Sequence, residues 1–328
     1  MRYLYRRIVF YLVALWASLT INFFLPRLMP GDPIGAFLTR FRDQLASDPH
    51  ILDTIRIELG GSKDPLWKQY FEYLWNTAHG DLGVSYSQYP TPVRDIISTT
   101  LPWTLLLAGS ATVLAFLIGT LLGIIASWRR QGVVDRVVTP LTMFTYSFPP
   151  FFLAMLVLYF LGVQAGWFPL NHAYGDDVQI SWTPSFIASA ADHAVLPVFA
   201  FLLYSVGGWL LGMRNVMINT LSEEYVTMAQ AKGLKDSRVM LRYAARNAML
   251  PQITSFAITI GYIITGLILI EDVFAYPGVG YTLVQAVQGS DYPLMQALFL
   301  LITVAVLAAN FIADLLYTWL DPRARAGH

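Results

Sequence analysis

The chain has 328 residues, with no cysteine and few lysines, and each scarcity removes a class of function. Without cysteine there are no disulfides and no thiolate metal sites. The five histidines are scattered without metal-ligand spacing. A phosphate-binding P-loop needs Gly-Lys-Ser/Thr, whereas Lys63, Lys68, Lys232 and Lys235 follow Ser, Trp, Ala and Leu. We therefore expect this chain to bind no metal or cofactor and to hydrolyse no nucleotide through a P-loop.

Charge is also scarce, and this sets the class of protein. Charged residues make up 13% of the chain and hydrophobic residues 56%, with a mean hydropathy of +0.53. The formal net charge is zero, so nothing favours a nucleic-acid partner. Because so apolar a composition is untypical of a soluble domain, the sequence predicts an all-α membrane protein in contact with lipid.

Six charge-poor runs have about the 20 residues that cross a bilayer. They cover residues 8–25, 103–128, 137–163, 194–213, 251–270 and 293–320. A secretory signal peptide starts much like the first run, but this run ends in a Pro and Gly turn without a small-residue cleavage site, so we expect a retained span. Several runs contain Pro or paired Gly, as at Pro149–Pro150, and we expect these helices to be bent.

Basic residues predict the orientation of the spans. Most Lys and Arg residues fall on the side that carries both termini, which is therefore expected to be cytoplasmic. The expected divisions are an N-terminus with the first span (1–30), an extracytoplasmic loop domain (31–98), a five-helix core (99–320) with a cytoplasmic loop at 214–250, and a tail (321–328). Within the loop domain, local patterns predict short helices at 53–59 and 67–75.

The cytoplasmic loop has the most informative pattern. Thr220 and Glu223 have the spacing of a capping box, which predicts a helix start. Gly233 is suited to the left-handed position that ends a helix. Between them Ala229 and Ala231 are small, so a partner surface could approach the backbone closely.

A second short helix is expected to begin at Asp236 or Ser237. Arg238, Arg242 and Arg246 then recur every four residues along one face. A passive, positively charged loop would explain these arginines, but not the ordered small residues, the glycine or the Leu-Pro pair that follows.

This pattern resembles the EAA loop of ABC importer permeases, and most closely that of the peptide-permease branch. The resemblance implies a six-span helical bundle of the type I importer class, with an extracytoplasmic loop domain after the first span. It also implies that the two short helices dock on an ATPase subunit. The docking residues implied are Glu224, Tyr225, Ala229, Ala231, Lys232, Gly233, Arg246, Asn247, Leu250 and Pro251.

Other segments extend the resemblance over essentially the whole chain. Residues 30–33 (PGDP), 80–85 (GDLGVS) and 320–323 (LDPR) are similar to segments of the same branch. A further segment is similar to the external turn after the fifth span, which implies an external gate formed by Glu271, Phe274, Pro277, Gly278 and Gly280.

The implied function is that of a cell-membrane permease subunit that forms half of a translocation pathway and is not itself an enzyme. Its implied partners are a second homologous permease, two ATP-binding subunits that use ATP and magnesium, and an extracytoplasmic solute-binding protein. The cargo stays open between peptides, oligosaccharides and nickel.

Two other classes of membrane protein are the alternatives. An ion-coupled secondary transporter usually shows acids within its spans, and Asp314 alone lies well inside an apolar run, where a helix-end ion pair is an equal explanation. An intramembrane hydrolase needs a Ser, His or metal constellation at membrane depth, and no histidine lies there.

Overall fold

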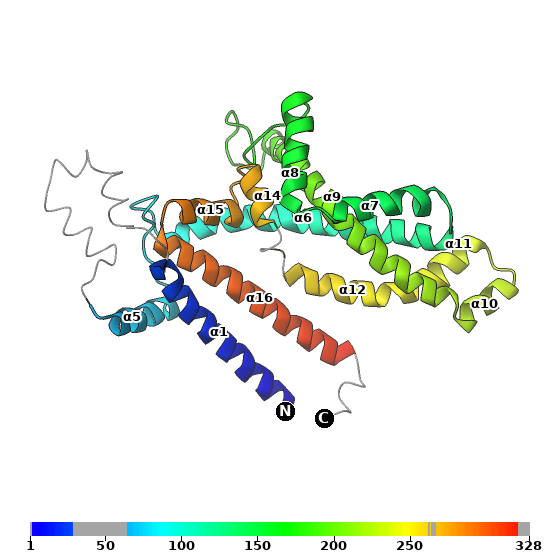
Figure 1. Ribbon diagram of the computed structural model, residues 1–328, viewed down its shortest axis with the longest axis horizontal. Helices are drawn as coiled ribbons and strands as arrows, with labels where there is room; N and C mark the ends of the chain where they lie inside the picture. Colours follow the sequence, from blue (N-terminus) through cyan, green and yellow to red (C-terminus); the bar gives the residue numbers. More distant parts are fainter. Residues whose placement is uncertain (1, 29–63, 262, 264–266, 321–328) are drawn as a thin grey trace. The chain divides into compact units, whose positions relative to one another are not determined.

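A computed structural model describes residues 2–28, 64–261, 263 and 267–320, and all regular elements in these ranges are helical (Figure 1). The chain forms two compact units. One comprises Met1–Pro102 and Gly278–Phe311, and the other Trp103–Pro277 and Ile312–His328. The PGDP segment, the helix expected at 53–59 and the tail lie outside the described residues.

The first unit is built on a pair of long apolar helices, α1 (Arg2–Leu28) and α16 (Tyr292–Leu320). The rings of Tyr11 and Phe311 meet edge to face at 5.5 Å, and the Asn22 side chain donates a 2.6 Å hydrogen bond to the Gln296 carbonyl. The unit also contains α5 (Leu66–Ala78) and α15 (Val279–Gln288). Helix α5 confirms the helix expected at 67–75.

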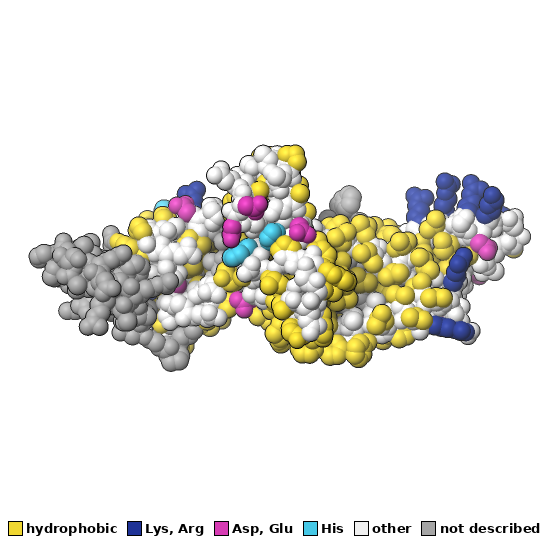
Figure 2. Space-filling view, turned by 90° about the horizontal axis from the view of Figure 1, so that it is seen from above, with side chains coloured by type: hydrophobic (Ala, Val, Ile, Leu, Met, Phe, Trp, Pro, Cys, Tyr) yellow, Lys and Arg dark blue, Asp and Glu magenta, His cyan; other side chains and the backbone are white. Residues whose placement is uncertain are grey.

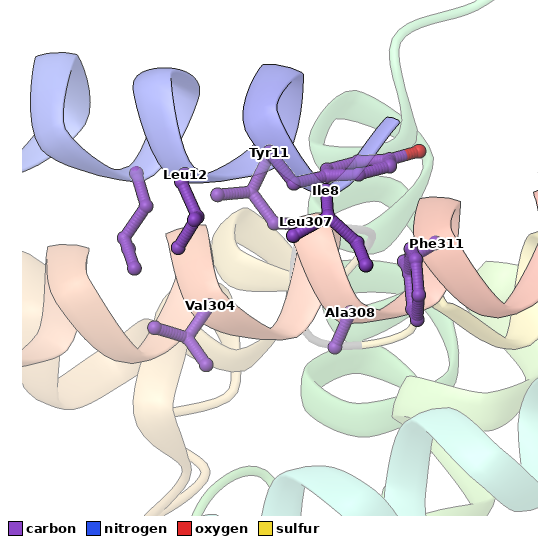
Figure 3. A pocket seen from close by; sticks show the side chains of 8 residues that line it. Ile8, Tyr11, Leu12, Val304, Leu307, Ala308 and Phe311 are labelled. Carbon is purple, nitrogen blue, oxygen red and sulfur yellow. The ribbon is translucent and has the colours of Figure 1, made fainter. Parts of the chain in front are cut away.

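An apolar groove runs between α1 and α16 (Figure 3). Ile8, Tyr11 and Leu12 line it from α1, with Val304 and Phe311 on α16, and its cavity volume is about 270 Å³. Because its walls are aliphatic and aromatic, the groove suits hydrocarbon and does not suit a polar solute.

The second unit contains most of α6 (Val93–Trp128) and the whole of α9 (Pro184–Leu221). Between them lie a π-helical turn, η1 (Val134–Val138), then α7 (Thr139–Tyr146), α8 (Pro150–Val157) and a second π segment, η2 (Leu158–Gln164). The chain bends by 107° between the α7 and α8 arms. This angle confirms the bend expected at Pro149–Pro150. The helix breaks there because each proline removes a backbone hydrogen-bond donor.

The remaining elements follow α9 in order. They are α10 (Glu224–Ala231), α11 (Asp236–Arg238), the π segment η3 (Val239–Ala245), α12 (Arg246–Gly261) and α14 (Ile268–Val273).

Glycines allow α6 and α9 to pack in direct backbone contact. A Cβ on Gly119 would lie 2.5 Å from the Trp209 Cβ, and one on Gly123 would lie 2.6 Å from the Leu210 carbonyl oxygen. A Cβ on Gly212 would meet Gln252 of α12 at 2.7 Å. The four-residue spacing of Gly119 and Gly123 therefore gives the close helix approach that small residues allow.

Four helices in the described ranges are long and apolar enough to cross a membrane, or five if the bent α7–α8 pair is one span. The sixth expected span, 251–270, cannot be followed throughout, because residues 262 and 264–266 lie outside the described residues. Asp314 lies on α16, and its side chain is likewise outside them.

Helix ends differ from the expected spans. Helix α6 begins at Val93, inside the expected loop domain, and α9 begins at Pro184. Both helices start in polar sequence, where Asp95 in the first turn of α6 and the Thr183 cap of α9 favour helix formation. The span expected to start at Pro251 is part of a longer helix, because α12 begins at Arg246 and Pro251 lies inside it.

Candidate coupling loop

Helices α10 and α11 form a folded structure at the end of α9. Val226 and Ala229 of α10 are buried against Val239 of η3, and Trp128 and Tyr243 pack around them. These contacts fix the position of α10 although it has only eight residues, too few for a helix that is stable alone. The loop predicted at 214–250 is therefore an ordered pair of helices.

The start of α10 differs from the expectation. Thr220 belongs to α9, and its hydroxyl donates to the Val216 carbonyl at 2.9 Å. Glu223 stands before α10 with an extended backbone, and its side chain makes no capping hydrogen bond. The capping-box prediction is wrong because α9 continues through Thr220 to Leu221.

Gly233 has the predicted conformation. Its φ is +70°, in the left-handed region, and its amide donates to the Gln230 carbonyl at 2.9 Å just after α10 ends. A Cβ built at Gly233 has no atom of this chain within 4 Å. Glycine is therefore favoured here by the backbone conformation and not by crowding within the chain.

The second helix begins at Asp236, as predicted, and continues much further than expected. Segments α11, η3 and α12 follow one another without interruption from Asp236 to Gly261. Ala244, Ala245 and Ala248 are buried against Met213 and Met217 of α9. The helix after the turn thus packs along the end of α9.

The predicted docking residues divide into two groups. Ala229 is only 3% exposed and lies in the inner contact with Val239, so it is not available to a partner. The other nine are exposed: Glu224, Tyr225, Ala231, Lys232, Gly233, Arg246, Asn247, Leu250 and Pro251. Arg238 and Arg242 are exposed as well.

One exposed residue was missed by the sequence analysis. Met228 is 60% exposed and Tyr225 is 41% exposed, and their spacing of three places them on the same face of α10. Their burial pattern is the reverse of that of Val226 and Ala229, which also differ by three. The regular spacing of these four residues is visible in the sequence itself.

An ion pair ties the neighbouring segment to α9. The Arg214 guanidinium lies 2.9 Å from Asp135 of η1, and its Nε donates to the same carboxylate oxygen at 3.0 Å. The other carboxylate oxygen accepts from the Gln131 amide at 3.0 Å. Figure 2 shows Lys and Arg side chains gathered at this end of the second unit, with hydrophobic side chains covering its middle.

Comparisons with known proteins agree with this geometry. The family described as "Binding-protein-dependent transport system inner membrane component" matches residues 119–326. The chain belongs to this family of ABC importer permeases. It is 32% identical over 324 residues to the oligopeptide transport system permease protein AppB of Bacillus subtilis, covering 98% of each chain.

Two further relatives match over nearly their whole length. The di/tripeptide transport system permease protein DppB of Pseudomonas aeruginosa is 31% identical, with 93% of each chain covered. The glutathione transport system permease protein GsiC of Escherichia coli K12 is 31% identical, with 99% of each chain covered.

The predicted external gate of the permease lies where the chain leaves the second unit. Glu271 is fully buried in α14, and its carbonyl accepts a 2.8 Å bond from the Tyr276 amide. Phe274 is 1% exposed and belongs to the core. Between them and α15, Ala275 has a φ of +45°, which gives a tight turn. Glu271 and Phe274 are thus packed inside, and neither lies on an open surface.

The rest of this segment carries the chain from the second unit, whose first stretch ends at Pro277, into the first unit, which resumes at Gly278. Pro277 is followed by Gly278, which precedes α15 with an extended backbone. The Thr282 hydroxyl donates to the Gly278 carbonyl at 2.8 Å, and Gly280 is buried in the first turn of α15. These residues form the start of a helix.

A buried acidic side chain organises one end of the first unit. Asp291 is fully buried before α16. One of its oxygens accepts from the Ser85 hydroxyl and from both the amide (2.9 Å) and the hydroxyl (2.7 Å) of Ser87. The other accepts from the Leu294 amide at 3.2 Å, which caps α16. Asp291 therefore joins the GDLGVS segment to α16.

Proposed function

We propose that this chain is the permease subunit that provides half of a peptide translocation pathway and receives force from a separate ATPase through α10 and α11. The observation that carries the proposal is the folded helix pair itself. It has an inner face packed on the permease and an outer face with Tyr225 and Met228 exposed.

The connection from this pair into the helices of the second unit supports a coupling role. The helix that begins at Asp236 is uninterrupted to Gly261, and its buried alanines pack against α9. A displacement applied at the turn around Gly233 is therefore passed to α9 and α12 together. Alternating access needs such joint movement of several spans.

The proposed partners follow from this mechanism. They are a second homologous permease, two ATP-binding subunits that bind and use ATP and magnesium, and an extracytoplasmic solute-binding protein. The chain itself would then be a transport subunit without catalytic residues. The basic end of the second unit is proposed to face the cytoplasm, with both termini on that side.

Peptides are the proposed cargo because the relatives described above are named as oligopeptide, di/tripeptide and glutathione permeases. Oligosaccharides and nickel remain the alternatives.

Variants of Gly233 test the coupling role. A β-branched residue in the left-handed region costs about 1–2 kcal/mol, and the side chain also enters the space where a partner would pack. We expect Gly233→Val to leave the permease inserted and folded, to reduce the amount of ATPase subunits that co-purify with it, and to abolish uptake.

Two further variants separate backbone from contact effects. Asparagine tolerates the left-handed region, so Gly233→Asn tests the added side chain with little backbone cost, and Gly233→Ala tests the backbone with little added bulk. In a passive basic loop, Arg238→Gln with Arg242→Gln would be the damaging change. Normal uptake and normal ATPase recovery with Gly233→Val would contradict the proposal.

A further inference from the structure

Helix α5 is fixed against the C-terminal end of α1. The ring of Tyr70 meets Phe23 at 5.2 Å and its hydroxyl lies 2.7 Å from the Thr20 hydroxyl. Tyr73 also contacts Phe23, with ring centroids 5.6 Å apart. At the end of α1, Arg27 donates to the Gln69 side chain at 3.3 Å. The contacts therefore reach from Thr20 to Arg27 along α1.

These contacts set the depth of α5 relative to a bilayer. The apolar part of α1, Tyr5–Leu25, has 21 residues. At 1.5 Å per residue it spans roughly 31 Å, which matches a hydrocarbon core of about 30 Å. Thr20 then lies roughly 7 Å inside the boundary near Leu25, and Arg27 lies just beyond it. Helix α5 is thus held at the level where hydrocarbon meets headgroups.

A second face of α5 is aromatic and exposed. Trp67, Phe71 and Trp75 recur every four residues and are 65%, 63% and 68% exposed. This spacing places them in one stripe along the helix. Three exposed aromatic rings in a row are unusual for a surface in contact with water alone.

The third face of α5 is polar. Lys68 forms ion pairs with Asp64 at 3.0 Å and with Glu72 at 3.9 Å, and Asn76 continues the row. Each of Lys68, Glu72 and Asn76 follows a stripe residue by one position, which turns this row about 100° away from the aromatic stripe. The helix therefore presents one side to α1, one apolar side and one charged side.

We propose that α5 lies in the membrane interface, with Trp67, Phe71 and Trp75 inserted among lipid acyl chains and with the Lys68 row in water. Amphipathic helices of this kind bury their apolar face about 5–10 Å into the headgroup boundary. Trp is enriched at that depth because its ring is apolar and its N–H is polar. The helix thereby anchors the end of α1.

Lipid is favoured as the occupant over a soluble protein because of continuity with α1. Phe24, which stacks on Tyr70 with ring planes 17° apart, is itself 41% exposed on the apolar helix α1. A surface at the depth of a membrane span is reached by lipid first. A docking protein would instead be expected to meet the charged row.

The natural absence of cysteine makes the test direct. Single cysteines at Trp67, Phe71, Trp75 and Ala78 would carry an environment-sensitive nitrobenzoxadiazole label, with Asn76→Cys as the control on the polar face. Ala78 lies seven residues after Phe71 and is exposed on the same side, so Ala78→Cys samples this face without removing a ring. The whole transporter, with cysteine-free partner subunits, would be placed in phosphatidylethanolamine and phosphatidylglycerol nanodiscs.

Lipids bearing a nitroxide near the carbonyl or near the chain end would serve as quenchers, with iodide in the water. We expect blue-shifted emission at the four apolar-face positions and stronger quenching by the shallow nitroxide than by the deep one. The label at Asn76 should be quenched by iodide. Iodide access at both faces without nitroxide quenching would overturn the proposal, and exclusion of both quenchers from the apolar face would overturn it in favour of a protein partner.

Discussion

The buried carboxylate of Asp291 offers a quantitative test of how the first unit is held together. Asp291→Ala removes one acceptor that serves the Ser85 hydroxyl and two donors of Ser87, and it also removes the cap of α16 at Leu294. The Ser85 and Ser87 hydroxyls lie 3.3 Å apart and can partly satisfy each other, but the Ser87 amide has no such substitute.

The magnitude follows from these contacts. A hydrogen bond to a charged group contributes about 1.5–3 kcal/mol, and an unsatisfied buried donor costs about 1–3 kcal/mol. With partial rescue between the serines, we expect Asp291→Ala to lower the free energy of local opening by about 3 kcal/mol. Asp291→Asn keeps one acceptor oxygen and should cost about half as much. Since 1.36 kcal/mol is a factor of ten, the two variants correspond to roughly 100-fold and 10-fold larger equilibrium constants of opening, and to hydrogen exchange that is faster by the same factors.

Hydrogen exchange of the peptide that contains Ser85 and Ser87, measured by mass spectrometry on the permease in nanodiscs, reports this opening. The control is Asp192→Asn, which removes an exposed acid and should leave the peptide unchanged. If the exchange of this peptide is the same in Asp291→Ala and in the parent, the carboxylate does not hold the GDLGVS segment and the reasoning fails.

Two further predictions concern the second unit. Gly123→Ala should destabilise the permease by an overpacking cost of about 1–3 kcal/mol, because its Cβ would lie 2.6 Å from the Leu210 carbonyl oxygen. This destabilisation should appear as a lower thermal midpoint of the detergent-solubilised permease. Gly109→Ala, on the same helix with no atom within 4 Å, is the control, and equal effects would exclude the packing explanation. For orientation, an impermeant thiol reagent should label Ser185→Cys in intact cells and leave Ser237→Cys unlabelled. Labelling of both would show that the proposed topology is wrong.

Much of the architecture could be predicted from local sequence. The helix 67–75, the bend at Pro149–Pro150, the start at Asp236 and the left-handed Gly233 are confirmed. Each depends on the properties of a few adjacent residues, such as a missing donor or a missing Cβ. Hydropathy located the apolar parts of the four long helices but not the helix ends, because it reports the thickness of lipid and not where a helix stops. Helix α6 therefore begins ten residues before the predicted span.

The roles of single side chains were harder to predict. Ala229 is small, and a small residue permits close contact on either side of a helix. Only its packing on Val239 shows which side it serves. Asp291 makes its bonds to residues more than 200 positions earlier in the chain, a pairing that no local pattern encodes. The exposure of Met228 could have been predicted from the sequence, because the buried and exposed residues of α10 follow a regular helical period.

The glycine contacts of α6 with α9 have a mechanical consequence. Where large side chains interdigitate, one helix can slide along another only if rotamers change in step. At Gly119 and Gly123 the facing atoms are backbone and Cβ atoms of α9, which have no rotamers to change. Small sliding movements of packed helices are a known mode of conformational change. At these two positions, the resistance to sliding comes from backbone and Cβ contacts alone. A single added methyl group would block the movement.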